Sequence, residues 1–350
     1  MRLMFVYFLM DDAGSAQDIR NYATVAKALG HEVSIYGPKA VHSSYNLSKD
    51  IQSAEAVIFI FEWTTEMRYG DQLDLTRLVA KVPRDKRIVI DCDGAYNDAI
   101  TVEGDYNHRD KAASQAWTDV CDSLSDKIFQ PTLRPLRDNV RTFFFHAYDP
   151  SWERSLYLNP KEYGMVYVGH SKFRWQPMYR VLQSVEPILN QVGRIALVGH
   201  GWDELPPWAE FMQMEDAYYT DVSYLQKLDV KIIPPISSEE VITWMSKGLF
   251  SPVIYRPLFR HLQFVTCRTF ETPAASTIPL FGLDPNYVRE IYGQEAIELV
   301  LPDEQPEQKV LDMLYRPNFY ANIVRGIREH LAIKHSYAAR LRELLQLVND

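Results

Sequence analysis

Residues 2 to 37 read RLMFVYFLMDDAGSAQDIRNYATVAKALGHEVSIYG, and this stretch decides the fold class. The apolar and aromatic run at 2 to 9 has the length of a buried strand, and residues 16 to 30 carry apolar side chains at helical spacing. Gly30 is placed to end that helix, and a second strand-like run follows at 31 to 37. A strand, a helix and a strand in this order predict a βαβ unit with a parallel sheet behind it.

The same alternation continues along the chain and restarts once. Further strand-like runs lie at 56–61, 87–91, 126–131 and 141–147. The polar, proline-containing stretch 148–164 is the predicted linker. After it, strand-like runs lie at 165–169, 194–201, 229–235, 252–257 and 277–282, with helices expected at 178–193 and 237–248. From about Asn318 the spacing is helical to the end.

This organisation predicts an α/β chain with two parallel-sheet domains of similar size. We expect an N-terminal domain at 1–155, a second at 156–325, and a C-terminal helix at 326–350 that packs back on the first. Two such domains place the carboxyl ends of two parallel sheets across a cleft, where these folds bind ligands. The loops that follow the strands are therefore the predicted site.

Composition narrows the class of function. The chain has 350 residues and a formal net charge of -9, which argues against nonspecific binding to nucleic acids or anionic membranes. Cys92, Cys121 and Cys267 are widely spaced without a zinc-ligand pattern, and they suit a reducing compartment. The N-terminal apolar run ends in Asp11-Asp12, so it reads as a strand and not as a signal peptide or membrane span. We expect a cytoplasmic protein with no integral membrane segment.

Two loops carry groups suited to phosphate. In the loop GHSKFRW, Gly169 permits close backbone approach, and Ser171, Lys172 and Arg174 are donors for phosphate oxygens. The alternative is a solvated basic turn. Gly199, in the later Gly-His-Gly, either approaches a phosphate or sugar or forms a tight turn.

The stretch CRTFETPAAS, residues 267 to 276, places Arg268 and Glu271 three apart among small and apolar residues. The longer segment RTFETPAASTIPLFG resembles GT-B glycosyltransferases of the glycosyl transferases group 1 kind. In that family a glutamate here binds the ribose hydroxyls of a nucleotide sugar and basic residues hold its diphosphate. The resemblance therefore implies a ribose role for Glu271 and a phosphate role for Arg268.

The match has departures. Gln263 stands where a Glu-x7-Glu element needs its first glutamate, so the Arg-x-x-Glu form of phage DNA glucosyltransferases fits better. The competing interpretation is an i,i+3 ion pair on a helix surface, worth about 0.2 to 0.5 kcal/mol. Pro273 is tolerated mainly in the first turn of a helix, so we expect the helix to begin near it.

The resemblance implies a fold and an activity. The fold is GT-B: two Rossmann-like domains that face an interdomain cleft, closed by C-terminal helices. The activity is that of a hexosyl- or pentosyltransferase that moves a sugar from a nucleoside-diphosphate sugar, expected to be of the UDP type, to an acceptor hydroxyl. Lys172, Arg174 and Arg268 neutralise the leaving diphosphate, so neither a metal nor another cofactor is expected.

The acceptor and the class of activity stay open. A saccharide, a lipid-linked sugar or a small metabolite is the expected acceptor, with DNA as a further option from the phage resemblance. Two other functions compete with transfer: a nucleotide-sugar epimerase of GT-B-like fold, and a non-catalytic two-lobed ligand-binding protein.

The first domain offers a general base. Asp91 and Asp93 follow the apolar run at 87–91, with Gly94 behind them. We expect Asp93 to face the cleft and take the proton of the acceptor hydroxyl, which would invert the anomeric centre. The alternatives are the Asp-x-Asp metal motif of GT-A enzymes and a plain turn or helix cap.

Three further groups of residues in the first domain are candidates for a place in the site or for a structural role. Asp11, Asp12 and Ser15 either bind acceptor hydroxyls or cap the following helix, and we expect capping. His146, alone at a strand end, is expected to be structural. Glu62, Trp63 and Arg68 follow another strand, and Trp63 is suited to stacking on a sugar face.

Overall fold

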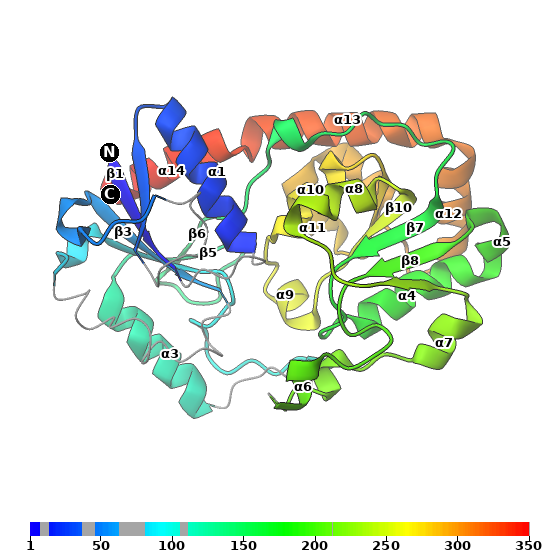
Figure 1. Cartoon of the computed structure of the whole chain (residues 1–350), viewed down its shortest axis with the longest axis horizontal. Helices are drawn as coiled ribbons and strands as arrows, with labels where there is room; N and C mark the ends of the chain where they lie inside the picture. The colour runs from blue at the N-terminus through cyan, green and yellow to red at the C-terminus, as the bar shows by residue number, and fades with distance from the viewer. Residues whose placement is uncertain (8–13, 37–45, 63–80, 106–110, 212, 350) are drawn as a thin grey trace.

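The computed structural model describes residues 1–7, 14–36, 46–62, 81–105, 111–211 and 213–349. The chain forms two halves side by side, each built on its own parallel sheet (Figure 1). The predicted fold class, two α/β units facing each other and closed by C-terminal helices, is confirmed.

The first half holds a sheet in the order β2-β1-β3-β4-β5-β6 with every neighbouring pair parallel. Its strands are β1 (Arg2–Val6), β2 (Glu32–Tyr36), β3 (Ala56–Phe61), β4 (Arg87–Asp91), β5 (Ile128–Gln130) and β6 (Val140–Thr142). Because helices cover both faces, the central strands are apolar on both sides, and every residue of β3 and β4 is buried.

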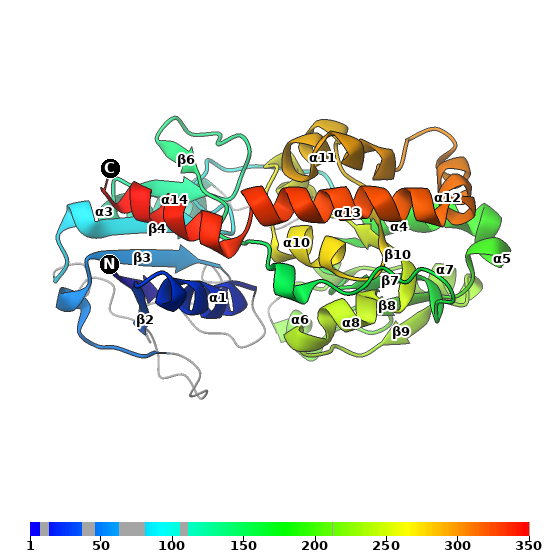
Figure 2. The same ribbon diagram turned by 90° about the horizontal axis from the view of Figure 1, so that it is seen from above.

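Two layers of helices cover this sheet. The helices α1 (Gly14–Ala28) and α14 (Tyr337–Asn349) share one core with it, and α3 (Lys111–Leu124) packs on the opposite face. The C-terminal helix thus belongs to the core of the first half, where both termini lie (Figure 2). The domain limits at residues 155 and 325 remain predictions.

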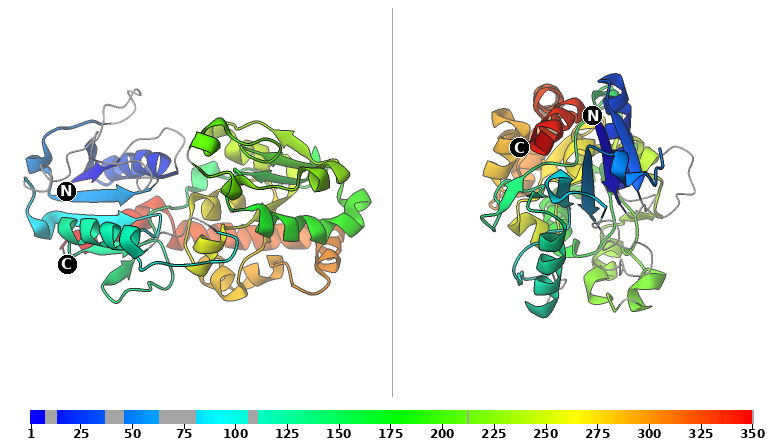
Figure 3. Two further views of the ribbon diagram at one scale, coloured as in Figure 1. Left: turned by 90° about the horizontal axis from the view of Figure 1, so that it is seen from below. Right: turned by 90° about the vertical axis from the view of Figure 1, so that its left-hand side faces the viewer.

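The second half holds a sheet in the order β11-β10-β7-β8-β9, again all parallel. Its strands are β7 (Tyr163–Val168), β8 (Ile195–Val198), β9 (Lys231–Ile233), β10 (Gly248–Val253) and β11 (Ile278–Phe281). Figure 3 shows the two halves side by side from below, and end-on with the first half in front.

Ten helices of the second half fall within the described residues. They are α4 (Trp175–Val185), α5 (Leu189–Val192), α6 (Pro207–Phe211), α7 (Val222–Lys227), α8 (Val241–Met245), α9 (Pro257–His261), α10 (Cys267–Ala274), α11 (Pro285–Tyr292), α12 (Pro306–Tyr315) and α13 (Pro317–Lys334). Short 3-10 helices of the described residues in both halves lie at Ile51–Ser53, Arg84–Lys86, Pro150–Trp152, Glu186–Ile188, Asp216–Tyr218, Ser238–Glu240 and Gln294–Leu299. None of the helices in the described part of the chain combines the length and apolar character that a bilayer crossing needs.

The chain returns to the first half through α13 and α14, which lie end to end along one side of the molecule (Figure 2). His335 lies at their junction, and its ring contacts Phe144 of the first half and Phe270 of α10. Its carbonyl accepts the Tyr148 N–H at 2.8 Å. This junction therefore ties the two halves together beside the start of the linker, to which Tyr148 belongs.

Two local predictions were wrong. The strand expected at 141–147 ends at Thr142, although Phe143 to Ala147 are buried. The helix α10 begins at Cys267, so Pro273 lies near its end and not in its first turn. The cause is a capping box: the Thr266 side chain and the Thr269 hydroxyl satisfy N–H groups at the helix start, which places the start six residues before the proline. Arg268 consequently lies in the first turn itself.

Candidate active site

A cleft lies between the halves, at the carboxyl ends of both sheets. Its lining comes from the ends of β3 and β4 on one side and of β7 and β10 on the other. In each sheet the strand order reverses there, between β1 and β3 and between β7 and β10. Ligands of open α/β sheets bind at such switch points. The topology alone therefore marks this cleft as the candidate site.

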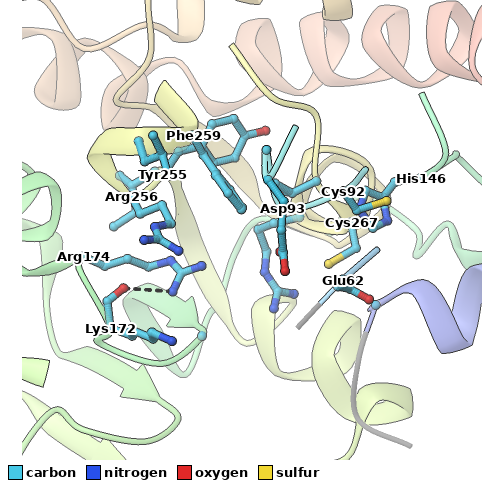
Figure 4. Close-up of a pocket in the computed structure, with 18 of the residues that line it drawn as sticks. Glu62, Cys92, Asp93, His146, Lys172, Arg174, Tyr255, Arg256, Phe259 and Cys267 are labelled. Atoms are coloured by element: carbon cyan, nitrogen blue, oxygen red, sulfur yellow. Dashed lines mark hydrogen bonds between the residues drawn. The ribbon is translucent and has the colours of Figure 1, made fainter. Parts of the chain in front are cut away.

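One wall of the cleft, here called the basic wall, carries Lys172, Arg174, Arg256 and Arg268 of the second half. Figure 4 labels the first three. Lys172 and Arg174 follow β7, Arg256 follows β10, and Arg268 opens α10. Burial is the main cause that lowers the pKa of the Arg174 guanidinium, but arginine stays charged at neutral pH. Two of the four cations already have carboxylate partners, since Arg256 pairs with Asp105 and Arg268 pairs with Glu271.

A neutral histidine supports the basic wall. Arg174 Nη1 lies 2.8 Å from His170 Nδ1. Burial, followed by the charges of Arg174 and Lys172, lowers the pKa of His170 well below its ordinary value. His170 is therefore an uncharged imidazole that accepts a hydrogen bond from Arg174 and orients it.

Arg268 and Glu271 form an ion pair, with Arg268 Nη1 2.6 Å from Glu271 Oε2. The pair is not on the surface, since the side chains are only 19% and 5% exposed. Arg268 lines the cleft, while Glu271 lies behind it and does not. The geometry unites the two interpretations of this motif: the residues are paired at i,i+3, and the pair presents a cation to the cleft.

Ser171 and Gly199 were predicted to contact the ligand, but neither lines the cleft. The Ser171 hydroxyl is fully buried and donates to the Gly201 carbonyl at 2.7 Å. Gly199 has φ of 138°, and a Cβ there would lie 2.6 Å from the Gly169 carbonyl oxygen. Gly199 thus allows the loop after β8 to pack against the loop after β7. Both residues shape the Gly169 to Arg174 loop, of which Gly169, Lys172 and Arg174 line the cleft.

Arg256 was missed by sequence reasoning, and its partner comes from the opposite half. Its Nε and Nη2 donate to the two carboxylate oxygens of Asp105 at 2.8 and 2.6 Å. Asp105 Oδ2 also accepts the Leu258 N–H at 3.0 Å. The Arg256 guanidinium lies 4.5 Å from the Phe173 ring centroid. A bidentate, buried pair of this kind clamps the halves together across the cleft.

The sequence feature that could have identified Arg256 as a cleft residue is its position directly after a strand of the second half. The segment PVIYRP was read only as a strand, although its arginine stands where the other ligand-facing loops begin. The pairing with Asp105 had no such signal, because 151 residues separate the two.

The opposite wall, here called the acidic wall, contains Glu62 and Asp93. Asp91 is fully buried and accepts the N–H groups of Asp93, Ala95 and Tyr96 at 3.2, 3.0 and 2.8 Å. Asp91 is thus the turn residue of the Asp-x-Asp pair, and the turn presents Asp93 to the cleft. Gly94 has φ of 71°, and a Cβ there would meet Leu262 Cδ1 at 2.7 Å, so this turn needs glycine.

Glu62 follows β3 and faces the same space. Its Oε2 accepts the Tyr7 hydroxyl at 3.1 Å and the Ser15 N–H, in the first turn of α1, at 3.0 Å. A carboxylate at this position interacts favourably with the helix dipole of α1. Glu62 rather than the Ser15 side chain therefore caps the helix. Asp11, Asp12, Trp63 and Arg68 lie outside the described residues.

His146 also lines the acidic wall, although it was expected to be only structural. Its Nδ1 lies 2.6 Å from Asp18 Oδ2, and the ring is 4% exposed. Within the described ranges, no group of three or more His, Cys, Asp or Glu side chains is arranged to hold a metal ion.

Comparison with solved structures shows that the fold is similar to that of glucosyltransferases. T4 phage beta-glucosyltransferase in complex with UDP-glucose superposes with a TM-score of 0.61 at 13% identity, with all of both chains covered. An alpha-glucosyltransferase in complex with UDP-glucose and DNA containing an abasic site gives 0.61 at 12% identity, covering 100% of this chain and 99% of that one. The T4 enzyme is also known with UDP and Mn²⁺ (TM-score 0.60, 11% identity, complete coverage of both chains). No protein-family model and no curated protein sequence matches the chain. The chain has the GT-B fold of these glucosyltransferases.

Proposed function

We propose that the protein is a glycosyltransferase that moves a sugar from a nucleoside-diphosphate sugar to an acceptor hydroxyl in this cleft. The observation that carries the proposal is the division of charge: Lys172, Arg174, Arg256 and Arg268 line one wall, and Glu62 and Asp93 line the other. Sugar transfer needs both, because charge builds on a diphosphate while a proton leaves the acceptor.

The basic wall is suited to the donor. Arginine forks bind phosphate oxygens with two parallel hydrogen bonds, and α10 begins on this wall at Cys267, which lines the cleft beside Arg268. We propose that Arg268 turns from Glu271 to the diphosphate, which frees a Glu271 oxygen to accept a ribose hydroxyl. UDP is the proposed nucleotide because the solved relatives of this fold are described with UDP or UDP-glucose.

The reaction follows from these positions. As the acceptor oxygen bonds to the anomeric carbon, the bond from that carbon to the diphosphate oxygen breaks and its electron pair leaves with the nucleotide. The cations stabilise that developing charge; removing one such contact typically costs about 10²- to 10³-fold in rate. Asp93 lies on the wall opposite the leaving group and is the acceptor-side group predicted from sequence. Attack from that side inverts the anomeric centre.

A neutral acceptor, such as a saccharide, fits the acidic wall best. Glu62 and Asp93 accept hydrogen bonds from hydroxyls but repel phosphates, and the chain carries a formal charge of -9. The alpha-glucosyltransferases of this fold are described in complex with DNA, so DNA is the alternative acceptor to be tested beside a saccharide.

We propose that transfer needs no metal, since arginine and lysine supply the charge that a metal ion would otherwise contribute. The proposed compartment is the cytoplasm, supported by the free thiols of Cys92, Cys121 and Cys267.

The test is a donor panel. UDP-, GDP- and dTDP-glucose are each incubated with the protein, alone and with oligosaccharides or duplex DNA, and free nucleoside diphosphate is measured. Transfer predicts that a saccharide accelerates release from the UDP-sugar and gains the sugar. An epimerase would convert the donor without acceptor, and a binding protein would release nothing. Either outcome would refute the proposal.

A further inference from the structure

A buried cluster of hydrogen-bonded side chains, Asp18, His146 and Tyr337, is assembled at the acidic wall from three distant parts of the chain. Asp18 of α1 is 2% exposed. Its Oδ2 lies 2.6 Å from His146 Nδ1, and its Oδ1 accepts the Tyr337 hydroxyl of α14 at 2.5 Å. Both carboxylate oxygens are therefore engaged, one by the imidazole and one by the C-terminal helix.

The far side of the His146 ring faces the cleft. His146 is one of the lining residues, and among the described residues Nδ1 is the only ring nitrogen of His146 with a hydrogen bond, leaving Nε2 for the cleft. A Cβ added at Gly14 would lie 3.6 Å from His146 Cε1 and 3.2 Å from Cys267 Sγ. The ring therefore stands close to the start of α10, where the donor phosphates are proposed to bind. Figure 4 shows it beside Glu62, Cys267 and Asp93.

The hydrogen bond to Asp18 decides the chemistry of the ring. A carboxylate is an acceptor, so Nδ1 carries the proton and Nε2 has a free lone pair when the ring is neutral. Burial acts to lower the pKa of His146, but the carboxylates of Asp18, Glu62 and Glu271 outweigh it, so the pKa is raised above its ordinary value. The Cys267 thiol is a neutral neighbour, because burial raises its pKa far above neutrality.

We propose that His146 is the general base for the acceptor hydroxyl, held in the required tautomer by Asp18 and Tyr337 as positioning residues. This proposal rests on the proposed function. Nε2 takes the hydroxyl proton as the acceptor oxygen bonds to the anomeric carbon and the electron pair of the broken bond leaves with the nucleoside diphosphate. The resulting imidazolium is stabilised by the Asp18 carboxylate. Asp93 then orients the acceptor by accepting a hydrogen bond from it.

The assignment differs from the sequence prediction in the group that takes the proton. An imidazole matches a reaction near neutral pH better than a carboxylate, because their ordinary pKa values are about 6.5 and about 4. The carboxylate, imidazole and reacting hydroxyl also form the arrangement in which a buried aspartate orients a histidine base in hydrolases.

The test measures UDP release from UDP-glucose with water as acceptor, alongside UDP affinity. Replacing the base lowers the rate by about 10²- to 10⁴-fold, so we expect that loss in His146→Gln with UDP affinity unchanged within about twofold. Added imidazole should restore the rate of His146→Ala. His31→Gln, at the N-terminus of β2, is the matched histidine control and should keep the wild-type rate.

The pH profile separates a base from a structural residue. Activity of the wild type should fall as pH drops through the raised pKa of His146. Tyr337→Phe removes a hydrogen bond from Asp18, which makes the carboxylate and hence His146 more basic, so the acid limb should move to higher pH.

Two results would overturn the assignment while leaving the function intact. One is a His146→Gln enzyme within about threefold of the wild-type rate. The other is a His146→Ala enzyme that imidazole does not rescue together with an acid limb near pH 4, the ordinary carboxyl range. If the wild type neither binds UDP nor cleaves any nucleotide sugar, the proposed function itself fails, and this assignment fails with it.

Discussion

The basic and acidic walls of the cleft are built in different ways. The basic wall comes from two stretches of one half, Gly169 to Arg174 and Arg256 to Arg268. The acidic wall takes Glu62, Asp93 and His146 from three separate loops, and His146 is held from behind by Asp18 of α1, which also bonds Tyr337 of the C-terminal helix. In the proposed mechanism the first wall binds an anion through local motifs, and the second positions a proton through long-range contacts. Local motifs can be read in a sequence, and long-range contacts cannot.

A buried ion pair links the two halves: the side chains of Asp105 and Arg256 are 1% and 12% exposed. Removing one partner of a buried pair leaves an uncompensated charge and typically costs about 3 to 5 kcal/mol. We therefore expect Asp105→Ala to lower the free energy of unfolding by that amount in urea denaturation. The control is Asp98→Ala, since Asp98 is 95% exposed beside Arg137 and should change stability by less than about 1 kcal/mol. Equal losses in the two variants would refute the clamp.

Arg268 tests the basic wall alone. Arg268→Gln should lower kcat/KM for UDP-sugar by about 10²- to 10³-fold, because a donor aimed at the developing charge is lost. The double variant Arg268→Gln with Glu271→Gln leaves no buried charge unpaired and checks that the loss is not one of folding. Arg134→Ala, an exposed arginine outside the cleft, is the matched control. Similar rates for Arg268→Gln and Arg134→Ala would contradict the phosphate role.

The sequence predicted the sheets, the cleft and most of the basic wall because these depend on local patterns. Strand runs, the loop after β7 and the pair of Arg268 and Glu271 are each contiguous in the chain. Pro273 misled the prediction of the helix start, since the capping box at Thr266 and Thr269 outweighed the preference of proline. His146 looked isolated because Asp18 lies 128 residues away and Tyr337 still farther. Ser171 was predicted to bind phosphate from its place in the loop after β7, but its hydroxyl instead donates to the Gly201 carbonyl and joins two loops.

The junction of α13 and α14 gives a smaller, pH-dependent effect. Burial, with the nearby charges of Arg340, His330 and Lys334, lowers the pKa of His335 to about 3. The unfolded chain binds this proton near its ordinary pKa of about 6.5, so the stabilisation is present above that pH and is lost as pH falls toward 3.

At one pH unit below the ordinary pKa the loss is about 1.4 kcal/mol. His335→Asn keeps an acceptor for Arg340 but does not titrate. Between pH 7.5 and pH 5.5 the free energy of unfolding should therefore fall by about 1.4 kcal/mol less in this variant than in the wild type. His146, whose folded pKa is raised, titrates in both proteins and cancels in the difference. Parallel pH curves from urea unfolding of the two proteins would contradict the assignment.

The smallest expected effect is that of metal removal. In the proposed mechanism the cations of the basic wall supply the charge that stabilises the leaving group, so EDTA should change the rate of UDP release by less than about twofold. A large loss that Mn²⁺ restores would show that the basic wall is insufficient without a metal.

The measurement that tests the two-wall account most directly is calorimetric titration of UDP into the wild type, Arg268→Gln and Asp93→Asn. The account predicts that the wild type binds UDP and that Arg268→Gln binds about 10- to 150-fold more weakly, the loss of one charge-assisted hydrogen bond. Asp93→Asn, on the acidic wall, should bind UDP within about twofold of the wild type. No binding by the wild type, or equal weakening by both substitutions, would contradict it.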